Sequence, residues 1–200
     1  MAALTRLPDT PGRRDTDAAI IGRSRHEPEL FAALFDRYHA AIHGYAARRL
    51  GPALADDVAA ETFLIAFDRR GGYDLDRSDA RPWLYGIASN LIARRHRAEV
   101  RQYRALARAG TDEVAEGHAD RVAVRIDAQA ARGPLAAALA ALADGDRDVL
   151  LLVAWAELTV QEAAEALGIP AGTARSRLHR TRKRIRAALG ATAHGEDSDR

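Results

Sequence analysis

A short helix, a glycine turn and a second, basic helix follow one another between residues 159 and 189. Thr159 opens the pattern TVQE, in which a threonine N-cap and Glu162 each accept a hydrogen bond from the other's backbone N–H. Gly168 suits the left-handed position that ends a helix, and Pro170 suits the start of the next helix. This order predicts a helix-turn-helix, which constrains the C-terminal part of the chain to a small helical domain.

The second helix of this unit is strongly basic. Its sequence GTARSRLHRTRKRIR, residues 172–186, contains seven Arg or Lys residues and no acid. At 100° per residue, one stripe is suited to packing: Ala174, Leu178, Thr181, Ile185 and Leu189. An ordinary solvated face mixes charges, because like charges four residues apart, such as Arg180 and Arg184, cost about 0.2–0.5 kcal/mol. A polyanion converts that repulsion into counterion release, so we predict a nucleic-acid-binding face rather than a merely solvated one.

Composition favours an all-α fold. Apolar residues make up 48% of the 200 residues and are mostly Ala and Leu, with few of the β-branched residues that favour strands. Cysteine is absent, which excludes disulfides and thiolate metal sites and fits a reducing compartment. No apolar run approaches the roughly 20 residues that span a bilayer, so we expect no membrane segment and a cytoplasmic location.

The helical periods divide the chain into two helical domains joined by a flexible linker. We expect a mobile tail at 1–26 with a short turn near 18–21, a first domain at 27–108, a linker at 109–131 that is helical at its end, a second domain at 132–190 and a mobile tail at 191–200. In the first domain, helices are predicted from Pro28 to Leu50, over 54–69, and from Pro82 to about Arg108. In the second, helices are predicted at 135–142 and 147–158, after a break at Gly133-Pro134, and through the helix-turn-helix.

Three motifs stand in a fixed order along the chain. Glu61-Thr62-Phe63 lies in an acidic helix, Pro82-Trp83-Leu84 leads through Ile87-Ala88 to Asn90, and Gly172-Thr173 leads through Ser176-Arg177-Leu178 to Arg180. With these motifs, residues 28–188 resemble a bacterial RNA polymerase sigma factor of the extracytoplasmic-function (ECF) subfamily. The resemblance implies a region 2-like helical bundle, a region 4-like helix-turn-helix and a promoter-specificity factor that is not an enzyme and needs no metal or cofactor.

The resemblance also implies partners and residue roles. The implied partners are promoter DNA and core RNA polymerase. The factor would dock on the clamp helices of the polymerase β′ subunit, and an anti-sigma factor is a further candidate partner. The expected core-polymerase contacts are Asp56, Asp57, Glu61 and Phe63, with core packing as the alternative for Phe63. The expected contacts to the −10 element and its melted strand are Asn90, Arg94, Arg95 and Arg97; a continuous helix would align Trp83 with this stripe, although we expect Trp83 to be core. The expected −35 contacts are Thr173, Arg175, Ser176, Arg177, His179, Arg180, Lys183 and Arg184.

Two positions depart from the family's usual pattern. Ala60 stands where many members have glutamine, which removes one expected polymerase contact. Arg94 stands where many have an acid, which makes the −10 surface more cationic.

Two other functions fit parts of the sequence. A helix-turn-helix regulator that acts without polymerase explains residues 159–189 but not the acidic helix or the motif around Asn90. A metal enzyme would use His39 and His43, four residues apart, with Asp36 one turn earlier, but no HExxH motif or further ligand cluster supports it.

Overall fold

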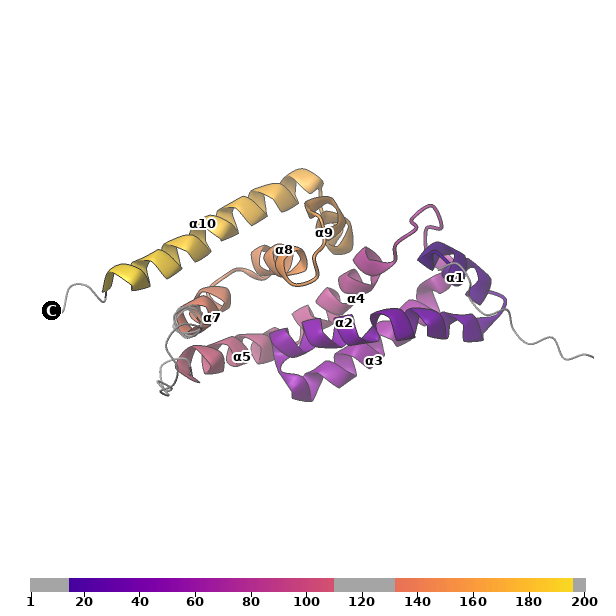
Figure 1. Cartoon of the computed structure of the whole chain (residues 1–200), viewed down its shortest axis with the longest axis horizontal. Helices are drawn as coiled ribbons and strands as arrows, with labels where there is room; N and C mark the ends of the chain where they lie inside the picture. Colours follow the sequence, from indigo (N-terminus) through magenta and orange to yellow (C-terminus); the bar gives the residue numbers. More distant parts are fainter. Residues whose placement is uncertain (1–14, 110–131, 196–200) are drawn as a thin grey trace, which may run out of the picture.

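The computed structural model describes residues 15–109 and 132–195, and within these ranges it contains helices and no strands (Figure 1). The elements of the first module, residues 15–109, are α1 (Asp17–Ser24), the 3₁₀ turn η1 (Pro28–Phe31), α2 (Ala32–Leu50), α3 (Pro52–Arg69), the 3₁₀ turn η2 (Arg70–Gly72), α4 (Arg81–Arg94) and α5 (His96–Ala109). Those of the second module, residues 132–195, are α7 (Arg132–Ala140), α8 (Asp144–Ala154), α9 (Val160–Leu167) and α10 (Ala171–Gly195). The predicted all-α fold is confirmed.

The helix α1 corrects the expectation of a mobile tail up to residue 26. Thr16 caps this helix by accepting a hydrogen bond from the Ala19 backbone, and Ile20 and Ile21 are buried. The buried carboxylate of Asp17 accepts hydrogen bonds from the Tyr38 hydroxyl (2.6 Å) and the Ala80 backbone N–H (2.7 Å). These long-range contacts hold α1 against the bundle. Residues 1–14 of the expected tail lie outside the described residues.

The core of the first module lies between α2, α3 and α4. Fully buried side chains from the three helices include Ile42 and Tyr45, Val58 and Ala59, and Leu84 and Ile92. Gly51 joins α2 to α3 at a φ of 85°, a backbone conformation that glycine adopts without strain. Pro52 then occupies the first turn of α3, where its missing N–H leaves no broken hydrogen bond.

The helix predicted from Pro82 to Arg108 is interrupted at Arg95. Arg95 leaves helical geometry with φ −101° and ψ 21°, so α4 ends at Arg94 and α5 begins at His96. The interruption redirects the chain, and Tyr103 and Glu99 of α5 become buried. The prediction of one continuous helix is therefore wrong. Trp83, Asn90, Arg94 and Arg97 do not share the single stripe that such a helix would have given them.

The second module contains the predicted helix-turn-helix, but several of its helix boundaries differ from the predicted ones. The helices predicted to end at 142 and 158 end at Ala140 and Ala154. Pro134 lies within the first turn of α7, where proline is tolerated, so Gly133-Pro134 does not break that helix. The aspartates of the first turn of α8 extend that helix to residue 144. The helix α10 continues to Gly195, beyond the expected end near residue 189 and into the expected tail. The helix expected near 121–131, the rest of the linker after Ala109, and residues 196–200 lie outside the described residues.

The two modules pack against each other along two pairs of helices. In Figure 1, α9 lies beside α4 and α7 lies beside α5, and the same two pairs are in contact in the structure. Buried residues from both modules form one continuous hydrophobic cluster, from Ile42 and Leu84 to Leu151 and Leu158. No helix within the described ranges is both long enough and apolar enough to cross a membrane.

Candidate nucleic-acid interface

The turn between α9 and α10 has the predicted geometry. The Thr159 hydroxyl accepts a hydrogen bond from the Glu162 backbone N–H (3.2 Å), and the Glu162 carboxylate accepts one from the Thr159 N–H (2.7 Å). Gly168 ends α9 in the left-handed conformation, with φ 62° and ψ 34°. Ala174, Leu178 and Thr181 of α10 are buried, as the angular pattern predicts, and Ile185 is half-buried. The opposite surface of α10 is therefore free to carry its charges.

One flank of α10 forms a cationic groove with the start of α9. The groove has a volume of about 420 Å³, and Val160 and Leu178 form its apolar floor. Its walls carry the basic side chains of Arg175, His179, Arg182, Lys183 and Arg186, all of them exposed. None of these five side chains forms an ion pair within the described part of the chain, so the arginines and the lysine can bind phosphate without losing another partner. We call this surface the α10 groove; Arg186 belongs to it although the sequence pattern did not single it out.

The other flank of α10 faces the first turn of α8. Arg180 donates two hydrogen bonds to the buried carboxylate of Asp146, from Nη2 to Oδ1 (2.8 Å) and from Nε to Oδ2 (3.2 Å). The pKa of Asp146 lies below its ordinary value because Arg180 hydrogen-bonds to it, with further attraction from Arg177 and Arg184. The expected −35 residues are thus divided: Arg175, His179 and Lys183 line the α10 groove, whereas Arg180, Arg177 and Arg184 gather near Asp146.

Two of the four residues predicted to contact the −10 element lie exposed on α4. Asn90 and Arg94 project from the same exposed side, four residues apart. Arg95 is half-buried and forms an ion pair with Glu61 of α3 (3.2 Å), while Arg97 is exposed on α5 beyond the break. The structure therefore brings Asn90 and Arg94 together and separates Arg97 from them.

The acidic helix α3 presents a mixed acidic and apolar surface. Asp56 and Asp57 are exposed, and Asp56 pairs with His43 of α2 (3.2 Å). Phe63 is only 5% exposed, and its ring centre lies 5.0 Å from that of Phe35, which favours the core-packing alternative for this residue. Leu64 is 62% exposed and was not predicted. The sequence could have indicated this residue, since Leu64 follows Asp57 and Glu61 at helical spacing on the same stripe of the helix.

The histidine pair on α2 is part of a stack of rings. His39 stacks on Phe35 with ring centroids 4.5 Å apart, and the rings of His39 and His43 are 6.0 Å apart. Within residues 15–109 and 132–195, no group of three or more His, Asp or Glu side chains is arranged to hold a metal ion.

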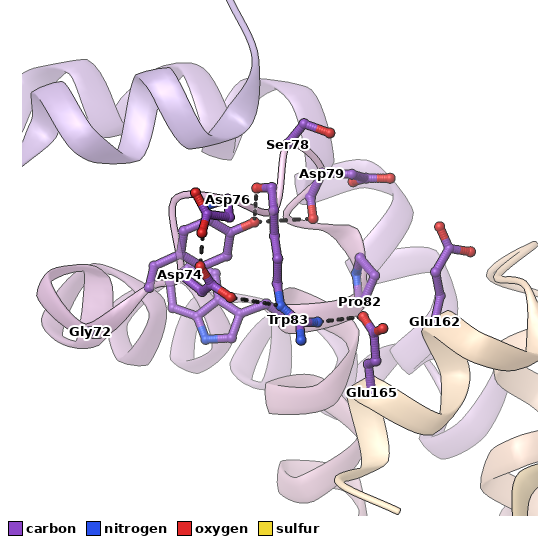
Figure 2. Close-up of a pocket in the computed structure, with 11 residues that line it drawn as sticks. Gly72, Asp74, Asp76, Ser78, Asp79, Pro82, Trp83, Glu162 and Glu165 are labelled. Carbon is purple, nitrogen blue, oxygen red and sulfur yellow. Dashed lines mark hydrogen bonds and ion pairs between the residues drawn. The ribbon is translucent and has the colours of Figure 1, made fainter. Parts of the chain in front are cut away.

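A pocket of about 510 Å³ lies where α9 meets the loop before α4. Figure 2 shows Glu162 and Glu165 of α9 across this pocket from the loop carboxylates of Asp74 and Asp76. Arg77 pairs with both Asp74 and Glu165 and so links the loop to the second module. Most of the charge around the pocket is negative, which disfavours DNA phosphate there.

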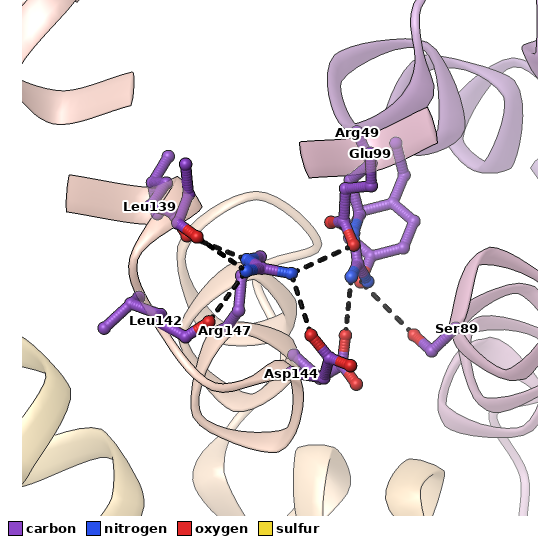
Figure 3. Close-up of polar contacts among 10 residues, drawn as sticks. Arg49, Ser89, Glu99, Leu139, Leu142, Asp144 and Arg147 are labelled. Atoms are coloured by element: carbon purple, nitrogen blue, oxygen red, sulfur yellow. Dashed lines mark hydrogen bonds and ion pairs between the residues drawn. The ribbon is translucent and has the colours of Figure 1, made fainter. Parts of the chain in front are cut away.

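A buried ionic cluster joins α2 and α5 of the first module to α8 of the second (Figure 3). Glu99 of α5 pairs with Arg49 of α2 (2.6 Å) and with Arg147 of α8 (3.2 Å), and none of the three side chains is more than 1% exposed. Arg147 also donates to the carbonyls of Leu139 (2.9 Å) and Leu142 (2.7 Å). Asp148 forms an ion pair with Arg49 (2.6 Å), and burial raises the pKa of this carboxyl.

The fold and the exposed cations define a two-module helical DNA-binding protein, and comparisons with known proteins give its family. The sigma-70 region 2 model matches residues 34–102, and the sigma-70 region 4 model matches residues 132–185. The chain is 32% identical to ECF RNA polymerase sigma factor SigW of Bacillus subtilis over 82% of this chain and 90% of that protein. It is 31% identical to the ECF RNA polymerase sigma factor SigL of Mycobacterium tuberculosis over 86% and 96%. The chain belongs to the ECF RNA polymerase sigma factors.

Solved structures share this fold. CnrH in complex with the cytosolic domain of CnrY matches with a TM-score of 0.59 and 23% identity, over 88% of this chain and 97% of that one. The sigma factor RpoE in complex with the anti-sigma factor NepR, from Bartonella quintana, matches with a TM-score of 0.55 and 20% identity, over 85% and 98%.

Family membership establishes the general activity. The chain is a promoter-specificity factor of bacterial RNA polymerase that acts in transcription initiation, and it is not an enzyme. The predicted sigma-factor resemblance is confirmed.

Proposed function

We propose that α10 reads the −35 element and that the α10 groove supplies most of the affinity for DNA. The observation that carries this proposal is the set of exposed cations, Arg175, Arg182, Lys183 and Arg186 with His179, which converge on one groove at the helix-turn-helix. Cations without acidic partners gain most from phosphate, since no existing ion pair has to be broken. Thr173, Ser176 and Arg180 lie near the start and middle of the helix, where side chains of a recognition helix reach base edges.

The exposed side of α4 is the proposed contact to the −10 element. Asn90 carries an amide that can donate to and accept from an adenine edge, and Arg94 adds a cation one turn further on. Arg97 extends the basic surface onto α5, and Arg95 contributes less because it is paired with Glu61. Opening of DNA needs no catalytic group, because capturing unpaired bases offsets the cost of a few kcal/mol for each base removed from the stack.

The exposed side of α3 is the proposed docking surface for the β′ clamp helices of core polymerase. Asp56, Asp57 and Glu61 give it negative charge, and the exposed Leu64 adds apolar area that a partner can cover. Phe63 would contribute indirectly, because its buried ring packs against the ring of Phe35. Ala60 leaves this surface without the glutamine that many members carry.

Two further parts of the proposal concern location and regulation. A factor that joins core polymerase works in the cytoplasm, so we place the protein there. One similar structure is a sigma factor in complex with an anti-sigma factor, and an anti-sigma factor is accordingly a proposed partner of this chain. The first domain is proposed to run from α1 to residue 108, beyond the expected start at 27, and the second to span 132–190.

Run-off transcription with purified core polymerase on a library of genomic fragments tests the proposal. The chain should add a set of transcripts that core polymerase alone does not produce, and their aligned start regions should share two elements. A polymerase-independent regulator would bind fragments without copurifying with core polymerase, and that result would overturn the assignment of the α3 surface.

A further inference from the structure

Arg180 is held by a carboxylate that lies outside the helix-turn-helix. Asp146 belongs to the first turn of α8, is 6% exposed, and accepts the Nε and Nη2 donors of Arg180 along one edge of the guanidinium. The Arg180 side chain is nonetheless 52% exposed. A guanidinium has five N–H donors, so a carboxylate that takes two leaves the two donors on its end edge available as a pair.

We propose that Asp146 is a positioning residue that fixes the guanidinium of Arg180 for end-on, bidentate recognition of a guanine in the −35 element. Guanine offers O6 and N7 as paired acceptors in the major groove, which match the remaining pair of donors. An unpaired arginine at this position would sample many rotamers and find phosphate as readily as a base. The inference rests on the proposed role of α10 and adds the residue that converts a general cation into a base reader.

The base-preference profile of the holoenzyme tests this inference. Core polymerase loaded with the full chain is offered a library of duplexes randomised over ten base pairs, and the bound fraction is sequenced. Wild type should prefer guanine at one position, and Asp146→Ala should lower that preference about 10-fold, in the range that a bidentate pair contributes. Arg180→Ala should lower it at the same position, and the double variant should show no further decrease. Asp144→Ala is the control, because it removes a carboxylate of the same turn that pairs with Arg147 instead.

The outcomes separate the two proposals. A uniform loss of binding in Asp146→Ala, or a changed preference at a position that Arg180→Ala leaves intact, overturns the positioning role. An unchanged profile in Arg180→Ala overturns the proposed role of Arg180 in reading −35 itself.

Discussion

The two helices assigned to DNA differ in how much of their surface they bury. The helix α4 buries nine of its 14 residues, and Asn90 and Arg94 are the polar residues that remain exposed in its last two turns. In α10, by contrast, Ala174, Leu178 and Thr181 are buried and a long cationic side is left open. A helix with many free cations binds any DNA through phosphate, whereas one with few exposed groups contributes little affinity and can contribute selectivity.

This difference suggests a division of work within the proposed function. The α10 groove would bring the factor to duplex DNA, and α4 would act once polymerase holds the −10 region close to it. Tethering raises the local concentration of a weak contact, so α4 does not need affinity of its own.

Removing the cations of the α10 groove should have the largest effect. In the triple variant Arg182→Ala, Lys183→Ala and Arg186→Ala, each phosphate contact removed should lower the salt slope of binding by about 0.9. Affinity for a 20-base-pair duplex of mixed sequence should then fall about 100-fold at 0.15 M salt. Fluorescence anisotropy across a salt series of the polymerase-free protein measures both quantities.

The matched control is the double variant Arg94→Ala and Arg97→Ala on α4 and α5. Its salt slope in free protein should change by less for each cation removed than that of the triple variant. Equal decreases for each cation would show that both surfaces bind phosphate alike. The α10 groove would then not be the main source of affinity for duplex DNA.

Asn90→Ala should act on DNA opening and leave duplex binding intact. The amide contact to a base edge corresponds to about 1–3 kcal/mol, or roughly 5- to 100-fold in open-complex formation by the holoenzyme. Permanganate footprinting of the −10 region reports opening, and anisotropy with the free protein reports duplex binding. A parallel decrease in both would place Asn90 in general DNA affinity.

The sequence predicted α10 well because local rules determine its structure. A glycine turn, a capping box and a strict apolar stripe fix the register of the helix, and the burial of Ala174, Leu178 and Thr181 follows from that stripe. The break at Arg95 and the burial of Phe63 depend instead on how distant helices pack. Asp146 is 34 residues from Arg180, so no local pattern indicates the pair. The charged face of α10 could thus be predicted from the sequence, whereas the contact between Arg180 and Asp146 could not.

Thr159→Ala should lower the stability of the second module by about 1 kcal/mol. The variant removes the hydroxyl that accepts the Glu162 N–H at the start of α9, and removal of such a cap typically costs about 0.5–2 kcal/mol. Urea unfolding followed by circular dichroism measures the change. Thr159→Ser keeps the acceptor and should stay close to wild type; an equal decrease in both variants would assign the effect to the methyl group of threonine.

Arg184→Ala should weaken DNA binding by a smaller amount and evenly across sequences. Arg184 is exposed and lies on the flank of α10 near Asp146 without the hydrogen bonds that Arg180 makes. Its removal should lower the salt slope by about 1 and leave the base-preference profile of the holoenzyme unchanged. A shift in preferred bases would mean that Arg184, and not Arg180, is the reading side chain on this flank.

The smallest effect concerns acid stability at the Asp146–Arg180 pair. The pKa of Asp146 is lowered in the folded protein by the Arg180 hydrogen bond, so the folded state holds fewer protons on this group than the unfolded chain does. The pair therefore contributes stability above the unfolded carboxyl pKa, about 3.9, and loses that contribution as pH falls through the lower folded value. The difference in free energy of unfolding between wild type and Asp146→Asn should stay constant from about pH 8 to 5 and shrink below about pH 4. Because Arg180 is exposed, solvent and salt should reduce this difference, and it should be smaller in about 0.5 M salt than in about 0.05 M. A difference that keeps its size down to about pH 3 would show that Asp146 acts through neutral hydrogen bonds, and α10 would then lack the charged anchor that distinguishes it from α4.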